Sequence, residues 1–106
     1  MHVLNIINRR TLLEYCSKYP AAAIALQEWY HEFAACSCRT FNELKQMYAH
    51  ASLVGDDRVV FNFMGNRFRL VVRVVFEFKV VQIKWFGTHQ AYDRIDVRTV
   101  QHKSKK

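Results

Sequence analysis

Residues 61–76, FNFMGNRFRLVVRVVF, decide the fold because their side chains alternate with a period of two. Successive side chains of an extended strand point to opposite faces of a sheet. One face receives an unbroken apolar row, formed by Phe68, Leu70, Val72, Val74 and Phe76. The other face receives three cations, Arg67, Arg69 and Arg73. The pattern predicts a strand with one side in the core and a cationic side opposite.

Further strands are predicted on both sides of this one. Residues 59–64 form a strand that ends in a tight turn at residues 64–66, residues 67–78 form the long strand, and residues 80–86 form the next. These strands leave no room for crossover helices, so they must pair antiparallel. In the last strand we expect Val81, Ile83 and Trp85 on one side and Gln82 and Lys84 on the other.

The N-terminal half predicts a short strand followed by two helices. Residues 1–7 are β-branched enough for the strand, and residues 9–19 have helical spacing of Leu12, Leu13, Cys16 and Tyr19. Pro20 stands where a second helix can begin, because the first helical position tolerates its missing N–H. The apolar positions of that helix include Ile24, Trp29 and Phe33.

A short third helix is predicted after Thr40, which forms the pattern of a capping box with Glu43. Residues 52–57, SLVGDD, are expected to form a loop, because a glycine and two acidic residues interrupt any periodicity. The order is β-α-α-(α)-β-β-β. It predicts an α+β fold in which an N-terminal strand and a helix pair pack on one face of an antiparallel sheet. Residues 1–106 fit a single domain that ends in a basic tail at about residues 97–106.

The net charge of +7 is confined to the C-terminal part of the chain. Residues 1–60 carry six basic and six acidic side chains, whereas residues 61–106 carry ten basic and three acidic ones. A polyanion is the partner that such a surface favours. A solubilising surface is the alternative, but it does not explain why the charge is segregated.

The chain is expected to act in the cytoplasm of its host cell. It has no long apolar run for a membrane span, and its N-terminus does not have the order of a signal peptide. Three cysteines, Cys16, Cys36 and Cys38, form no disulfide framework and are expected as thiols. Cys36 and Cys38 with His31 match no zinc spacing, so no metal and no other cofactor is predicted.

The cationic face gathers candidate functional residues. Asn62, Arg67, Arg69, Arg73 and Lys84 are expected there. Gly87 is expected to end the last strand, and a helical turn after it would put His89 and Tyr92, three residues apart, on one side. Cleaving RNA without a metal needs a base, an acid and cations beside the phosphate, which His, Tyr and Arg can supply. An arginine row can also be merely solvated, and Asp93 can pair with Arg94 or an arginine of the sheet.

Several motifs resemble the HigB family of toxins from bacterial type II toxin–antitoxin systems, within the RelE-like superfamily. The resemblance is carried by VVFNFMGNRFRLVVRVVF and IKWFGTHQAYDRI, with KYPAAAIALQEWY and FNELKQMYAHASLVGDD upstream. The matching positions are Asn62, Gly65, Asn66, Arg69, Thr88, His89, Tyr92 and Asp93. Met64 departs from the family, which often has a small residue before Gly65-Asn66.

The resemblance implies a RelE-like fold and an mRNA interferase, an endoribonuclease that in several relatives cuts messages on the ribosome. It implies Arg69 as the phosphate contact, and His89 and Tyr92 as proton-transfer residues without saying which is the base. Asn62, Asn66, Arg67, Arg73, Lys84 and Asp93 are the expected RNA-binding residues. The implied partners are mRNA, the ribosome and a HigA-type helix-turn-helix antitoxin, through which the chain would reach operator DNA. A non-catalytic basic module for RNA or DNA, and a face that receives an acidic antitoxin segment, are the alternatives.

Overall fold

The computed structural model describes residues 4–101. Residues 1–3 of the expected first strand and residues 102–106 of the expected tail lie outside this part. The elements are β1 (Asn5–Ile6), α1 (Arg9–Lys18), the 3₁₀ turn η1 (Pro20–Ala22), α2 (Ala23–Ala35), α3 (Phe41–Met47), β2 (Ser52–Gly55), β3 (Arg58–Phe63), β4 (Phe68–Val75), the 3₁₀ turn η2 (Phe76–Phe78), β5 (Val80–Thr88) and α4 (His89–Tyr92). The predicted α+β class is confirmed.

The five strands form one mixed sheet in the order β1-β5-β4-β3-β2. Strands β2 to β5 pair antiparallel as predicted, whereas β1 pairs parallel with β5 through Asn5–Val80 and Ile6–Val81. The antiparallel pairing predicted for the strands within residues 59–86 is confirmed, whereas the sequence predicted neither the partner nor the direction of β1. Because β1 and β5 lie far apart in the chain, no short turn determines their relative direction.

The predicted loop at residues 52–57 is wrong in its first part, since β2 pairs with β3. Asp56 and Asp57 make the hairpin turn, with φ of 50° and 59°. Aspartate tolerates this left-handed backbone better than most residues. The acidic pair was therefore a hairpin signal. The long strand β4 ends at Val75 and not at residue 78, because the 3₁₀ turn η2 follows.

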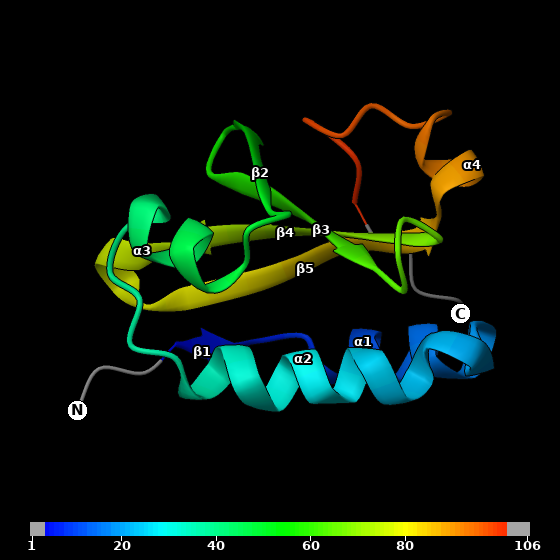
Figure 1. Ribbon diagram of the computed structural model, residues 1–106, viewed down its shortest axis with the longest axis horizontal. Coiled ribbons are helices and arrows are strands. Elements are labelled where there is room, and N and C mark those ends of the chain that lie inside the picture. The colour runs from blue at the N-terminus through cyan, green and yellow to red at the C-terminus, as the bar shows by residue number, and fades with distance from the viewer. Residues whose placement is uncertain (1–3, 102–106) are drawn as a thin grey trace.

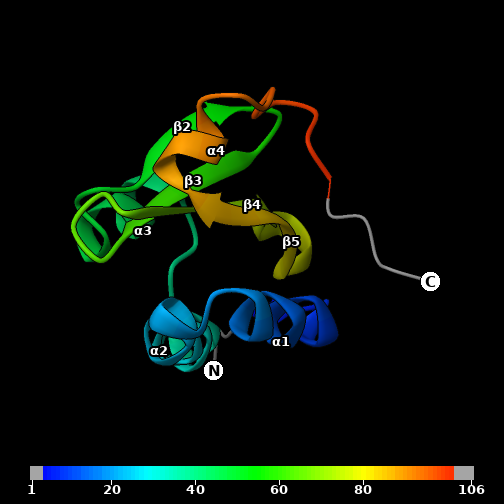
Figure 2. The same cartoon turned by 90° about the vertical axis from the view of Figure 1, so that its right-hand side faces the viewer.

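Helices α1 and α2 lie side by side beneath one face of the sheet (Figures 1 and 2). Helix α2 buries Leu26, Trp29 and Phe33, and the Phe33 and Phe61 rings are 5.5 Å apart. Of the apolar helix positions named from the sequence, Leu13 and Ile24 do not enter the core, since these side chains are 45% and 74% exposed. Helical spacing alone does not say which of two adjacent stripes meets the sheet.

None of the helices within residues 4–101 is both long and apolar enough to cross a membrane.

Helix α3 begins with the predicted capping motif. The Thr40 Oγ1 accepts from the Glu43 backbone N–H at 3.2 Å, and the Glu43 Oε1 accepts from the Arg39 backbone N–H at 2.7 Å. One N–H group of the first turn and one just before the helix thus find side-chain acceptors close in sequence. The motif also places Phe41 against Phe76, with ring centroids 5.0 Å apart.

A bulge at Lys84 changes the predicted faces of β5. Val71 is opposite Trp85 and Val72 is opposite Ile83, so Lys84 has no direct partner on β4. Trp85 consequently lies on the second face of the sheet, away from α1 and α2, and Phe86 enters the core in its place. The expectation that Trp85 shares a face with Ile83 is wrong, because a bulge inserts one residue and reverses the alternation.

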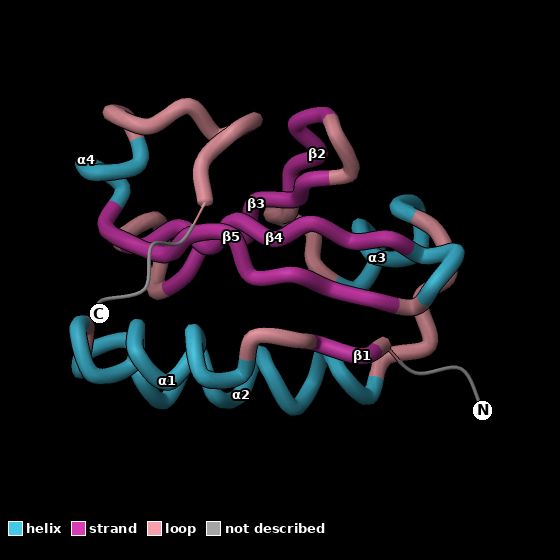
Figure 3. Tube along the Cα trace, turned by 180° about the vertical axis from the view of Figure 1, so that it is seen from behind, coloured by secondary structure: helices cyan, strands magenta, loops and turns pink. Residues whose placement is uncertain are grey.

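The second face of the sheet is not open as expected. After α4, the C-terminal segment (residues 93–101) runs back over this face (Figures 1 and 3). Arg58, only 4% exposed, donates from Nη1 to the carbonyl oxygens of Val97 at 3.1 Å and Val100 at 2.6 Å. Val60 and Val71 are buried on the same face. Residues 97–101 of the expected basic tail therefore cover part of the sheet.

Candidate functional site

Four of the predicted site residues meet at one end of the second face, and we call them the Arg69 cluster: Asn62, Asn66, Arg69 and Tyr92. Asn62 and Arg69 are cross-strand partners on β3 and β4. The Asn62 side chain donates to the Asn66 Oδ1 at 3.0 Å, and the Arg69 Nη1 donates to the Asn66 carbonyl at 2.9 Å. The Arg69 guanidinium carbon lies 5.9 Å from the centroid of the Tyr92 ring.

The turn between β3 and β4 shapes this cluster. Met64, Gly65 and Asn66 all have positive φ, at 51°, 59° and 75°. Glycine and asparagine adopt that region readily, which confirms the predicted turn and explains Gly65-Asn66. The left-handed conformation at Asn66 directs its carbonyl to Arg69 and its side chain to Asn62.

Arg69 is held by backbone groups and not by an acid. Besides Asn66, its Nη1 reaches the carbonyl of Phe68 at 3.3 Å. Within residues 4–101, no carboxylate forms an ion pair with Arg69; the two pairs there are Arg10 with Glu14 and Arg73 with Asp57. A half-buried guanidinium without an internal counter-ion keeps its positive charge available to an incoming anion.

Helix α4 brings the predicted proton-transfer residues to this end of the sheet. The Thr88 Oγ1 accepts from the Ala91 N–H at 3.1 Å and caps the helix, and the His89 N–H donates to the Arg67 carbonyl at 3.0 Å. Tyr92 reaches Arg69, whereas the exposed His89 side chain makes no hydrogen bond or ring contact with the described residues of the cluster. Sequence spacing placed His89 and Tyr92 on one helical turn, but only Tyr92 contacts Arg69.

Burial raises the pKa of Tyr92, with Arg69 acting in the opposite direction and Asp93 adding slightly to the rise. A phenol is protonated at neutral pH even at its ordinary pKa, and the rise keeps Tyr92 in this form to higher pH. The Trp85 ring helps to bury the Tyr92 ring, with 6.2 Å between their centroids. The exposed Asp93 follows Tyr92 at the end of α4.

Gly87 makes room for this arrangement. It is opposite Arg69 on β5, and a Cβ added there would lie 2.6 Å from a carbon of the Trp85 ring. The strand continues to Thr88, so the expectation that Gly87 ends it is wrong. This glycine is needed because the indole lies flat on the backbone beside the cluster.

The other predicted RNA-binding cations are elsewhere. Arg73 is four residues from Arg69 on β4, about 13 Å at the usual strand rise. It lies opposite the buried Arg58, and its Nη2 is 3.8 Å from Asp57. Burial and the charges of Arg58 and Arg73 lower the pKa of Lys84, whereas Asp56 raises it. These three cations, Arg58, Arg73 and Lys84, form a second group, the Arg58 group.

Arg67 is not on a strand as expected. It precedes β4 in the turn, is exposed, and its guanidinium carbon lies 6.0 Å from the centroid of the Phe68 ring. Two residues with a structural part in this face, Arg58 and Trp85, are absent from the predicted site. Arg58 had a signal, because it shares the alternation of Val60 and Asn62. Trp85 had none, since the bulge beside it depends on pairing with β4.

The chemistry of the Arg69 cluster suits a phosphate better than a metal. Its groups are a guanidinium, two carboxamides and a phenol, which bind and protonate oxyanions. Among residues 4–101, no three His, Cys, Asp or Glu side chains are grouped so that they could hold a metal ion. Cys16, Cys36 and Cys38 are buried and form no disulfide in this part of the chain.

Fold and site together define a small α+β domain with a basic, aromatic site at the end of a sheet. A family model described as the RelE-like toxic component of a toxin–antitoxin system, HigB toxin, matches residues 22–95. The chain belongs to this family, and the resemblance seen in its motifs is confirmed. Membership makes the chain a toxin component and implies an antitoxin partner. A search of curated proteins found no match.

Proposed function

We propose that the chain is an mRNA interferase, a metal-independent endoribonuclease that cuts messages and so inhibits translation and growth. The observation that carries the proposal is the position of Arg69. Its guanidinium faces the Tyr92 ring and donates to the backbone carbonyl of Asn66, has no carboxylate partner within residues 4–101, and belongs to the more cationic part of the chain. Such a cation can bind the scissile phosphate and stabilise charge in the transition state.

The reaction requires the 2′-hydroxyl oxygen to attack the adjacent phosphorus while the bond to the 5′-oxygen breaks. The attacking hydroxyl loses a proton to a base, and the departing oxygen takes one from an acid. Tyr92 is the acid in this scheme, because a phenol is protonated at neutral pH and this one lies beside Arg69, the proposed phosphate contact. His89, on the same turn, is the base, since an imidazole near neutrality can accept the proton. The products are a 2′,3′-cyclic phosphate and a 5′-hydroxyl.

Binding is assigned to the surrounding polar groups. Asn62, Asn66 and Arg67 would hold RNA close to the cut, and Asp93 would order the end of α4. Arg73, about 13 Å from Arg69 along β4, and Lys84 on β5 would contact the RNA backbone farther from the cut. Because RNA binding by cations releases counter-ions, binding should weaken steeply with added salt.

The cellular setting follows from this proposed activity. We assign the ribosome as the place of cleavage, the bacterial cytoplasm as the compartment, and a HigA-type helix-turn-helix protein as the antitoxin. Operator DNA would be reached only through that antitoxin. A small helix-turn-helix protein encoded beside the gene would support this assignment.

The test is to induce the chain in a bacterial host without its antitoxin and to map new RNA 5′ ends across the transcriptome. We expect new ends inside coding regions, lost with Arg69→Ala and with His89→Ala and kept with Arg39→Ala, an exposed arginine on the loop before α3. Intact transcripts with normal growth would reject catalysis. Salt-sensitive binding of RNA without cleavage would then favour the non-catalytic basic module, which the lack of contact between His89 and the cluster also permits.

A further inference from the structure

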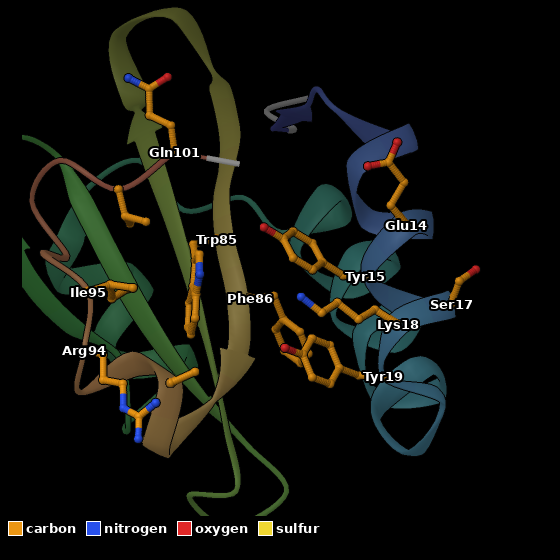
Figure 4. A pocket seen from close by; sticks show the side chains of 12 residues that line it. Glu14, Tyr15, Ser17, Lys18, Tyr19, Trp85, Phe86, Arg94, Ile95 and Gln101 are labelled. Carbon is orange, nitrogen blue, oxygen red and sulfur yellow. The ribbon is translucent and has the colours of Figure 1, made fainter. Parts of the chain in front are cut away.

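A groove of about 920 Å³ lies between α1 and β5 (Figure 4), and none of the four residues of the Arg69 cluster lines it. We call it the α1–β5 groove. Tyr15 and Lys18 of α1 and Tyr19 just after it line one side, where the Phe86 ring packs against both tyrosines. Trp85 of β5 lines the other side. The C-terminal segment closes the far side with Arg94 and its apolar neighbours. A space of this size takes several side chains, not a single ordered water.

Through Trp85 and Phe86, the groove reaches an incomplete edge of the sheet. Strand β1 pairs only with Val80 and Val81, whereas β5 continues to Thr88. The edge is partly occupied at one point, where the Tyr15 hydroxyl hydrogen-bonds the Phe86 backbone. Between Val81 and that point, the edge of β5 has no strand partner among the described residues. An unpaired edge is a template for an extended segment of another chain.

The rim of the groove is cationic. Lys18 and Arg94 are both exposed there, against the single carboxylate of Glu14, whose Oε2 lies 3.8 Å from the Nε of the exposed Arg10. A segment that fits must therefore present apolar side chains to the aromatic walls and carboxylates to the rim. The chain's own residues 102–106, HKSKK, have the wrong charge and no apolar side chain.

We propose that the α1–β5 groove binds an extended, acidic and apolar segment of the antitoxin. This segment pairs with β5 beyond the end of β1 and so continues the sheet. This inference rests on the antitoxin partner that the family implies and not on RNA cleavage. The groove also contacts the candidate functional site through one residue. Trp85 lines the groove on one side and contacts Tyr92 on the other, so an occupant packs against the ring that covers Tyr92.

The test uses the full chain and the antitoxin encoded beside its gene, purified separately from their co-expressed complex. Lys18→Glu combined with Arg94→Glu reverses the rim. Arg39→Glu combined with Lys79→Glu is the matched control, since both residues are exposed, lie away from the groove and give the same change in net charge. We expect the Kd to rise at least tenfold for the rim pair and less than threefold for the control pair.

Hydrogen exchange of the unaltered complex supplies a second readout. We expect the antitoxin to slow exchange of the amides at residues 82–86 and of the α1 residues facing them. Equal Kd values for the two pairs, or protection that leaves residues 82–86 unchanged, would overturn the proposal. So would slow exchange at the same amides in the free chain when its concentration is raised, which would indicate a second copy. Protection of these amides by an RNA oligonucleotide would likewise assign the groove to RNA.

Discussion

The guanidinium of Arg69 faces the ring of Tyr92, with 5.9 Å between the guanidinium carbon and the ring centroid. The two residues come from β4 and from the helix that follows β5, so the sheet brings them together from positions 23 residues apart in the chain. The cation favours the ionised phenol, but burial outweighs it and the pKa of Tyr92 is raised. The proposed proton donation beside a phosphate contact rests on this pair.

Tyr92→Phe removes the phenolic hydroxyl and its proton but keeps the aromatic ring. The ring contact with Arg69 remains, so RNA binding and folding should be unchanged, whereas cleavage should fall by about 10²–10⁴-fold if the phenol is the acid. The measurement is single-turnover cleavage of a defined RNA, together with its Kd. Because Tyr92 stays protonated up to at least its ordinary pKa, its ionisation should cause no loss of rate between pH 7 and 9. Unchanged cleavage by the variant would remove Tyr92 from the mechanism.

Arg58→Ala should release the C-terminal segment from the sheet. The substitution removes the donor of two hydrogen bonds to Val97 and Val100 and uncovers apolar surface around Val71. Loss of charged hydrogen bonds of this kind lowers the free energy of unfolding by about 2–4 kcal/mol. Urea unfolding and limited proteolysis within residues 93–101 are the measurements, with Arg39→Ala as the control. Equal stability of the two variants would show that the segment is held by other contacts.

Gly87→Ala should push the Trp85 indole off the sheet. The new Cβ would be 2.6 Å from the ring, so the ring must move and its contact with Tyr92 is lost. We expect a cost of about 1–3 kcal/mol and a changed tryptophan fluorescence spectrum. Gly65→Ala is the matched control: its Cβ would meet nothing within 4 Å, and only the positive φ of 59° adds a cost, of about 1–2 kcal/mol. An unchanged spectrum for Gly87→Ala would contradict the position of the indole.

The fold should lose stability in alkali above pH 10. Burial raises the pKa of Tyr15 to about 12, a hydrogen bond from the Phe86 backbone opposes the rise, and burial raises the pKa of Tyr48 as well. Above pH 10 the unfolded chain releases these protons before the folded chain does, so the free energy of unfolding decreases as pH rises. The stabilisation is fully present below pH 10 and, for Tyr15, is lost through about pH 12. Urea midpoints at pH 8, 10 and 11 test this.

Tyr15→Phe provides the comparison for that series. The variant lacks the phenolic proton, so its midpoint should change less between pH 10 and 11 than that of the unaltered chain. Identical slopes for the two proteins would mean that Tyr15 does not contribute to the alkaline loss.

Predictions that depend on local repetition agree with the structure. The period of two at Leu70, Val72 and Val74 placed these side chains in the core, where all three are at most 1% exposed. The capping motif of Thr40 and the turn at Gly65-Asn66 were also predicted correctly, because the groups that satisfy each other are a few residues apart. For the same reason, α1 and α2 were placed to within a few residues.

Predictions that depend on distant partners agree less well. The bulge at Lys84 reverses the faces of Trp85 and Phe86, and it exists only in the pairing of β5 with β4. The candidate site was foreseen in part: Asn62, Asn66, Arg69 and Tyr92 do meet, whereas Arg73 and Lys84 lie with Arg58. A strand holds residues that share a face in line, so sharing a face does not make them neighbours.

By itself, the sequence determined which face of β4 is apolar, where the main helices begin, and where the positive charge gathers. These features follow from side-chain periodicity, capping and composition, which act over a few residues. Only the tertiary structure decided that β1 joins β5 in parallel, that residues 93–101 cover the cationic face through Arg58, and that an edge of β5 stays open beside α1. Each depends on contacts between distant segments, whose geometry is set by the packing of the whole chain.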